Sequence, residues 1–150
     1  MTLVNPYLNF NGNTEEAFNF YKSVFGGEFA MIMRFKDTPG CENMPKVEQD
    51  HIMHIALPVG NSVIMGTDVP ESMGQVTFGS SVSLSISVDS REEADRVYSA
   101  LAEGGEASMP MNDMFWGDYY GMLTDKFNIQ WMISYSEKYA NPSQCSCFAT

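Results

Sequence analysis

The sequence predicts an α+β fold built from two tandem β-α-β-β-β modules. Two observations support this: an internal repeat, and alternating apolar segments placed alike around each copy of it. The repeated residues are Glu15-Glu16-Ala17, Tyr21 and Gly26-Gly27-Glu28, which recur as Glu92-Glu93-Ala94, Tyr98 and Gly104-Gly105-Glu106. Because a half-sized module leaves a sheet face uncovered, the repeat favours one pseudo-symmetric domain over residues 1–137. Module one is expected near residues 3–68 and module two near 80–136.

Composition excludes several classes of function. The chain has 150 residues, a net charge of −11 and only 8 Lys and Arg, so it offers no basic surface for nucleic acid. No apolar run reaches the roughly 18 residues that a membrane span needs, and the N-terminus lacks a signal-peptide pattern. We therefore expect a cytoplasmic protein with no nucleic-acid or membrane partner.

Module one contains five segments with the periodicity of secondary structure. The helix is expected to start with Thr14 as its cap, followed by Glu15 and Glu16, and to end at Gly26. The long unpatterned loop over residues 36–50 has the length of a lid. The five segments are a strand over 6–11, the helix, a strand over 29–35 and a hairpin of strands over 51–57 and 62–66.

Module two repeats this order. A strictly alternating segment over 81–88 predicts its first strand, and Ser90 is expected to cap a helix that Gly104-Gly105 closes. Three further strands are expected over 107–111, 119–124 and 129–135.

The first strand of each module has one apolar and one polar side. In module one, Leu8 and Phe10 alternate with Tyr7 and Asn9. In module two the polar side carries Ser83, Ser85 and Ser87. If the apolar sides pack on the helices, the polar sides line the helix-free face of each sheet, where we expect a cavity between the modules. The alternative is a solvated sheet face, which antiparallel sheets tolerate.

Several short motifs resemble those of one family. They are Pro6-Tyr7-Leu8, Phe10-Asn11-Gly12-Asn13, Phe20-Tyr21, His54, Phe115-Trp116-Gly117, Thr124-Asp125-Lys126-Phe127 and Trp131. The chain is similar to PhnB-like proteins of the vicinal oxygen chelate superfamily, which includes glyoxalases, dioxygenases and bleomycin-resistance proteins. The resemblance implies a glyoxalase-like curved, open-barrel mixed sheet with helices on its outer face, and a homodimer. Some members are labelled 3-demethylubiquinone-9 3-methyltransferase, but the sequence has no Gly-rich strand-to-helix loop for a nucleotide-type methyl donor.

The resemblance also implies where a metal centre would lie. Superfamily members hold a divalent metal with side chains from the first and last strand of each module. These positions fall here on Asn5 (or Pro6), Met65, Ser83 and Met132. None is a His, Asp or Glu, and a thioether is a poor ligand for a hard cation. We therefore predict no cofactor, and a divalent metal is disfavoured.

His54 is the candidate catalytic residue. It lies in a strand where Met53, Ile55 and Leu57 are expected to face the helix, so its imidazole is expected on the cavity side. A histidine there suits proton transfer or a ligand hydrogen bond, and the alternative is a structural histidine bonded to Tyr or Asn neighbours.

Aromatic and polar residues of module two complete the predicted ligand site. Trp116 and Tyr120 are expected to contact the ligand, whereas Phe115 and Trp131 are expected in the core. The predicted ligand-binding set is Tyr7, Asn9, His54, Ser83, Ser85, Trp116, Tyr120 and Gln130. The cysteines carry no predicted role: Cys41 lies on the loop over 36–50, and Cys145 and Cys147 lie in a tail, residues 138–150, that we expect to be disordered.

Two functions from different classes follow. The first is a protein that binds a small apolar or aromatic metabolite in the cavity between the modules, without the usual metal centre. The second is an enzyme of isomerase, lyase or oxygenase type that uses His54 as acid-base or as a relocated metal ligand. A purely structural role would instead require a cavity filled by side chains.

Overall fold

The computed structural model describes residues 2–137, which form parts of two compact units, residues 1–77 and 78–150. The boundary at Thr77 and Phe78 falls between the two predicted modules. The expected disordered tail, with Cys145 and Cys147, lies outside the described residues.

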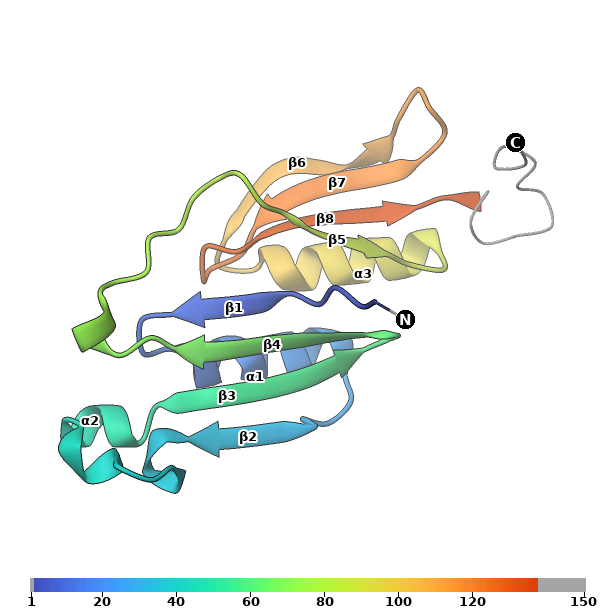
Figure 1. Ribbon diagram of the computed structural model, residues 1–150. Helices are drawn as coiled ribbons and strands as arrows, with labels where there is room; N and C mark the ends of the chain where they lie inside the picture. Colours follow the sequence, from blue (N-terminus) through green and yellow to red (C-terminus); the bar gives the residue numbers. More distant parts are fainter. Residues whose placement is uncertain (1, 138–150) are drawn as a thin grey trace. The chain divides into compact units, whose positions relative to one another are not determined.

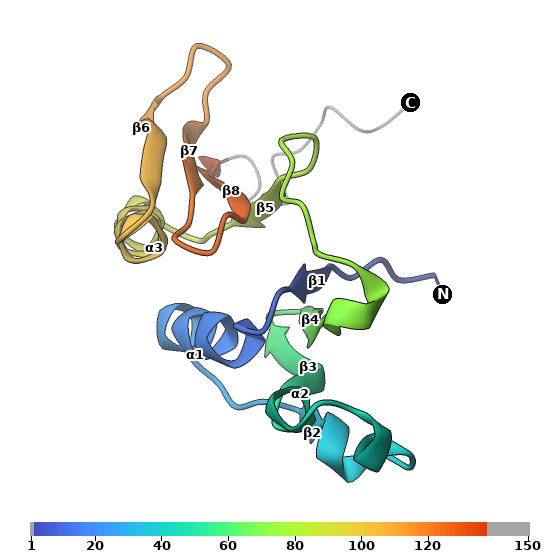
Figure 2. The ribbon, with the colours of Figure 1, turned by 90° about the vertical axis from the view of Figure 1, so that its left-hand side faces the viewer.

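The first unit is a four-stranded mixed sheet with one long helix on one of its faces (Figures 1 and 2). The strand order is β1-β4-β3-β2, with β1 parallel to β4 and the other neighbours antiparallel. The elements are β1 (Tyr7–Phe10), α1 (Thr14–Phe25), β2 (Met31–Arg34), α2 (Lys46–Gln49), β3 (Ile52–Val59) and β4 (Ser62–Asp68).

The second unit repeats this arrangement around a second long helix. Its strand order is β5-β8-β7-β6, with β5 parallel to β8 and the other neighbours antiparallel. The elements are β5 (Leu84–Ser87), α3 (Arg91–Ala102), β6 (Glu106–Asp113), β7 (Tyr119–Thr124) and β8 (Gln130–Tyr135). The predicted α+β fold of two β-α-β-β-β modules with mixed sheets is therefore confirmed.

Three details of the predicted elements differ in the structure: the start of one strand, the buried residue in another, and the character of the long loop. The strand expected from residue 81 starts only at Leu84, and Val82 before it is 70% exposed. In β3, Ile52 and not Met53 is fully buried, because the pairing with β2 skips a residue between His54 and Ile52. The loop over 36–50 is not unpatterned: it contains α2 and short 3₁₀ turns at Phe35–Asp37 and Cys41–Asn43.

The two long helices begin in different ways. Ser90 caps α3 as predicted, since its hydroxyl accepts a hydrogen bond from the backbone N–H of Glu93 at 3.1 Å. Thr14 is not the cap of α1. It is the first helical residue, and the preceding Asn13 makes no side-chain capping bond.

A buried carboxylate from β4 replaces the missing cap of α1. Asp68 is 2% exposed, and its Oδ1 accepts hydrogen bonds from the N–H of Gly12 at 3.1 Å and from the N–H and hydroxyl of Thr14 at 3.0 and 2.6 Å. Its Oδ2 accepts from the N–H of Ile52 at 2.8 Å. Four donors compensate the burial of one negative charge at a helix N-terminus, where the helix dipole also favours it. Asp68 thereby joins the end of β4 to the start of α1 and of β3.

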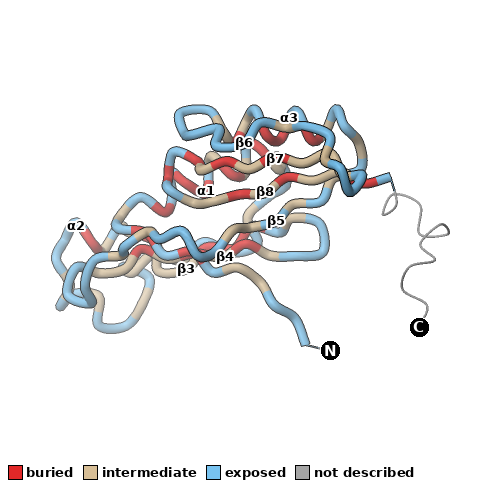
Figure 3. The backbone as a smooth tube through the Cα atoms, turned by 90° about the horizontal axis from the view of Figure 1, so that it is seen from above, coloured by how far each residue is buried: buried red, intermediate tan, exposed pale blue. Residues whose placement is uncertain are grey.

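Each helix packs closely on its sheet at a strand glycine. In the first unit, a side chain at Gly66 would come within 2.6 Å of the Phe18 ring, which is fully buried. In the second unit, a side chain at Gly121 would come within 3.0 Å of the Tyr98 ring. Buried residues along α1, β3 and β4 mark the first core, and buried residues along α3, β7 and β8 mark the second (Figure 3).

We predict that Asp68→Asn destabilises the protein by about 2–4 kcal/mol, because the amide nitrogen would face an N–H donor in a buried site. Chemical denaturation followed by circular dichroism measures this change. Asp50→Asn is the matched control, since the Asp50 side chain is 73% exposed, and it should cost less than about 1 kcal/mol. Equal effects of the two substitutions would contradict the role assigned to Asp68.

We also predict that Gly66→Ala costs about 1–3 kcal/mol, because the added methyl would displace the buried ring of Phe18. Gly79→Ala is the control: an added methyl there would meet nothing within 4 Å, and the backbone is not left-handed. Denaturant midpoints of the two variants provide the comparison. A Gly66→Ala protein as stable as Gly79→Ala would show that the helix can move away at little cost.

Candidate functional site

The helix-free face of the first sheet brings Tyr7 and His54 together. Leu8 and Phe10 are buried on the helix side of β1, so Tyr7 and Asn9 project from the opposite face as predicted. The Tyr7 hydroxyl lies 3.1 Å from Nδ1 of His54, and the two ring centroids are 5.7 Å apart. Because β4 separates β1 from β3, the phenol ring reaches across one strand to make this contact.

The second nitrogen of His54 has no hydrogen-bond partner among the described residues and is not fully buried. No hydrogen bond from Nε2 to any described residue is present, whereas every fully buried side-chain nitrogen or oxygen in the described part of the chain has a partner. His54 is only half-buried. Its Nε2 can therefore reach a bound molecule.

The Tyr7 phenol is protonated at neutral pH, although the residue is 44% exposed. Loss of solvent raises the pKa of Tyr7 above its usual value, and a hydrogen bond with Thr67 opposes this only in part. At neutral pH the Tyr7 hydroxyl therefore retains its hydrogen. Thr67 lies on the strand between Tyr7 and His54.

Methionines surround the Tyr7–His54 pair. Met33 is the register partner of His54, and Met65 is the partner of Tyr7. One row across the sheet consists of Met31, Ala56, Met65 and Tyr7. Their unbranched side chains give this face an adaptable apolar surface.

The second sheet carries the corresponding row. It consists of Met109, Met122, Met132 and Ser85, each paired in register with the next. Tyr120 precedes Met122 by two residues, as His54 precedes Ala56. Tyr120 thus holds in the second sheet the place that His54 holds in the first.

The residues predicted at the superfamily's metal positions lie in different surroundings. The Asn5 side chain accepts a hydrogen bond from the backbone N–H of Val63 at 3.0 Å and so ties down the chain before β1. Met65 and Met132 are half-buried, and Ser83 lies just before β5. Across residues 2–137, no three His, Cys, Asp or Glu side chains gather to hold a metal ion.

Aromatic residues of the second unit lie at the β6–β7 hairpin. The Trp116 and Tyr120 rings pack edge to face with centroids 6.1 Å apart, and Trp116 Nε1 donates to Asp118 at 2.9 Å. The prediction that Phe115 lies in the core is wrong: it is 98% exposed at the hairpin tip. The core prediction for Trp131 is right, since it is 1% exposed and donates to Asp125 at 2.8 Å.

The remaining predicted ligand residues differ in their surroundings. Asn9 and Ser85 are exposed on their sheet faces. Gln130 is instead used within its own unit, where its Nε2 donates to the backbone oxygen of Val82 at 2.8 Å and of Gly79 at 3.4 Å. Gln130 thereby anchors the segment that leads into β5.

Sequence reasoning missed a cluster at the base of the β6–β7 hairpin. Arg91 forms two hydrogen bonds with Asp113, at 2.8 and 2.9 Å, and its guanidinium lies over the Tyr119 ring. The Tyr119 hydroxyl donates to Asp95, which raises the pKa of Tyr119. The cluster fixes the hairpin that carries Trp116. No spacing in the sequence signals it, since the partners are 22 and 24 residues apart.

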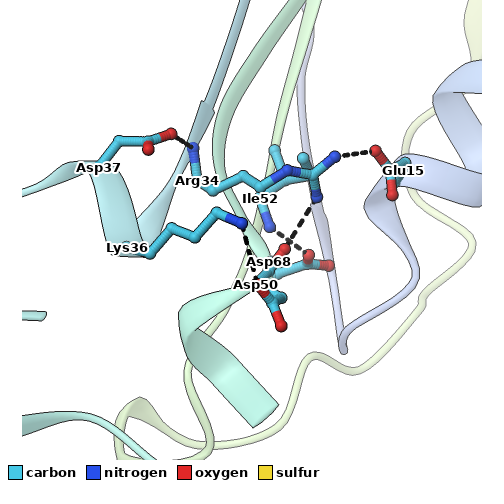
Figure 4. A network of polar contacts seen from close by, with 7 residues as sticks. All are labelled: Glu15, Arg34, Lys36, Asp37, Asp50, Ile52 and Asp68. Atoms are coloured by element: carbon cyan, nitrogen blue, oxygen red, sulfur yellow. Dashed lines mark hydrogen bonds and ion pairs between the residues drawn. The ribbon is translucent and has the colours of Figure 1, made fainter. Parts of the chain in front are cut away.

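A second polar network anchors the loop over 36–50 (Figure 4). The Arg34 side chain pairs with Glu15 of α1 and donates to the backbone oxygen of Asp50 at 2.8 Å. Lys36 pairs with Asp50 at 3.2 Å. These contacts hold the two ends of the loop together and join them to β2. Cys41, on the loop, lies 3.5 Å from the backbone oxygen of Lys36.

Comparison with known proteins places the chain in a family. Residues 2–134 match the family model described as 3-demethylubiquinone-9 3-methyltransferase. The protein YjdN of Escherichia coli K12 is 31% identical over 139 residues, which cover 87% of this chain and 93% of that protein.

None of the helices in the described residues combines the length and apolar character of a membrane span.

Solved structures agree with this match. The protein PA1353 from Pseudomonas aeruginosa has a TM-score of 0.78 and 37% identity, covering 91% of this chain and 98% of that one. A putative 3-demethylubiquinone-9 3-methyltransferase, the PhnB protein from Bacillus cereus, has a TM-score of 0.72 and 26% identity, covering 90% and 100%. Glyoxalase-related and glyoxalase/bleomycin resistance proteins, at 17–20% identity, share the fold. The chain therefore belongs to the 3-demethylubiquinone-9 3-methyltransferase-like, or PhnB-like, family of glyoxalase-fold proteins.

Proposed function

We propose that the chain binds a small apolar or aromatic molecule on the helix-free face of its first sheet, without the superfamily's usual metal centre. The observation that carries this proposal is the Tyr7–His54 pair at 3.1 Å, set among half-buried and exposed methionines. Small-molecule sites combine an apolar surface with a few polar groups that fix the ligand's orientation. His54 supplies such a group through its accessible Nε2.

The second unit carries an aromatic surface of its own, which suits an aromatic ligand. The Trp116 and Tyr120 rings offer flat amphipathic surfaces, and Trp116 is 47% exposed. The Arg91–Asp113 pair and the Trp116–Asp118 bond limit the freedom of these rings, which lowers the entropy lost when a ligand orders them.

Catalysis by His54 is the second candidate function. An imidazole whose Nδ1 is hydrogen-bonded and whose Nε2 is open has the arrangement of a general acid-base, since the bonded nitrogen fixes the ring while the other exchanges a proton. His54 as a relocated metal ligand would need further donors from a bound molecule or water.

We also propose that the chain acts as a cytoplasmic homodimer.

We predict that His54→Ala weakens binding of the aromatic probe 8-anilino-1-naphthalenesulfonate about two- to tenfold, the range of one lost hydrogen bond. Probe fluorescence gives the dissociation constant, and a thermal melt gives stability. His51→Ala is the control, because it removes the chain's other imidazole, which lies against Gly12 at the turn after β1. If His54→Ala mainly lowered the melting temperature and left binding unchanged, His54 would be a structural histidine.

Metal content separates the binding protein from the metal-dependent enzyme. For protein purified without chelators or a histidine tag, native mass spectrometry with elemental analysis should give a dimer mass and no stoichiometric divalent metal. A retained small molecule would identify the ligand. A stoichiometric metal that His54→Ala abolishes would contradict the proposal and support the relocated metal site.

A further inference from the structure

The direction of the Tyr7–His54 hydrogen bond decides what kind of ligand atom His54 can bind. A neutral imidazole carries one hydrogen on nitrogen, so one ring nitrogen donates and the other accepts. If Tyr7 donates to Nδ1, the imidazole hydrogen must lie on Nε2. If Nδ1 donates to Tyr7, then Nε2 is an acceptor. The two cases select ligands of opposite hydrogen-bonding character.

The 3.1 Å contact between the Tyr7 hydroxyl and Nδ1 of His54, together with the acid–base chemistry of the two groups, favours donation by Tyr7. The sp² nitrogen of imidazole is a far stronger base than a phenol oxygen, so the phenol is the better donor of the two. A phenol keeps its hydrogen at neutral pH, and partial loss of solvent raises the pKa of Tyr7 further.

We infer that Tyr7 is a positioning residue that donates its hydroxyl hydrogen to Nδ1 of His54, so that His54 holds its own hydrogen on Nε2 and selects ligands bearing an acceptor oxygen. The ligand class is then an apolar or aromatic body with a ketone, ester, carboxylate or similar oxygen. This inference rests on the proposed binding site on the first sheet.

An unsatisfied donor gives this selection its strength. The open Nε2–H would lose its water on ligand binding, and a ligand without an acceptor would leave it unpaired. Sites built around a fixed donor reject analogues that lack the matching atom more strongly than apolar pockets reject a change of size. Tyr7 acts by disfavouring the other tautomer, which would accept from a ligand that offers only an N–H donor.

The tautomer can be measured without any ligand. Long-range ¹H–¹⁵N NMR of the histidine rings at about pH 8, where unperturbed imidazole is neutral, distinguishes Nε2–H from Nδ1–H, and His51→Ala identifies the His54 signals. We expect the wild-type chain to hold only the Nε2–H form, and Tyr7→Phe to admit the Nδ1–H form. Tyr119→Phe, which removes a hydroxyl bonded to Asp95 in the second unit, should leave the His54 signals unchanged.

Two probes of matched shape test the ligand class. The ketone 2-acetonaphthone should bind the wild-type chain about two- to tenfold more tightly than 2-ethylnaphthalene, and His54→Ala should abolish this preference. Tyr7→Phe should reduce it, and circular dichroism checks that the variant folds. An Nδ1–H tautomer in the wild-type chain, or equal binding of the two probes, would overturn the inference but leave the proposed site standing. Failure of both probes to bind would overturn the site and the inference with it.

Discussion

The first unit depends on how the chain accommodates one buried negative charge. Asp68 ends β4, and its carboxylate accepts hydrogen bonds from the turn after β1, from the first residue of α1 and from the first residue of β3. No described lysine or arginine pairs with it, so backbone and hydroxyl donors alone stabilise the charge. This arrangement sets where α1 starts, and it holds the ends of β3 and β4 near the turn that leaves β1. Since Tyr7 lies on β1 and His54 on β3, the same carboxylate helps to fix the two strands that carry the site.

The close approach of each helix to its sheet explains why the polar pair lies on the opposite face. At Gly66 the ring of Phe18 contacts the strand directly, and at Gly121 the ring of Tyr98 does so. The glycine lies on β4 in one unit and on β7 in the other, so the helix contacts a different strand of the sheet in each unit. At these glycines the helix covers one face of each sheet, and the Tyr7–His54 pair lies on the face of the first sheet that the helix leaves uncovered.

Much of the fold could be predicted from local sequence, whereas the site contacts could not. The helix over 14–25 and the burial of Trp131 follow from periodicity and neighbouring glycines, which act over short distances along the chain. The role of Asp68 was missed because an aspartate at a strand end resembles a turn residue, and three of its four donors come from 54 or 56 residues away. The Tyr7–His54 bond spans 47 residues, so alternation could place both side chains on one face but could not show that they touch. The prediction that Phe115 lies in the core was wrong because aromatic residues occur both at hairpin tips and in core strands, and the local sequence does not distinguish the two.

The duplication allows the helix-free faces of the two sheets to be compared position by position. Both sheets have a methionine where the resemblance predicts the superfamily's last-strand metal ligand, Met65 paired with Tyr7 in one and Met132 paired with Ser85 in the other. Beside these methionines the halves differ: the first sheet has Tyr7 and His54, and the second has Ser85 and Tyr120 in the corresponding places. Only the first combination contains a group that can both donate and accept a proton near neutral pH. In the second, Tyr120 packs against Trp116 and adds flat apolar surface. The proposed site therefore depends on the first sheet, where His54 with Tyr7 can supply an oriented hydrogen bond.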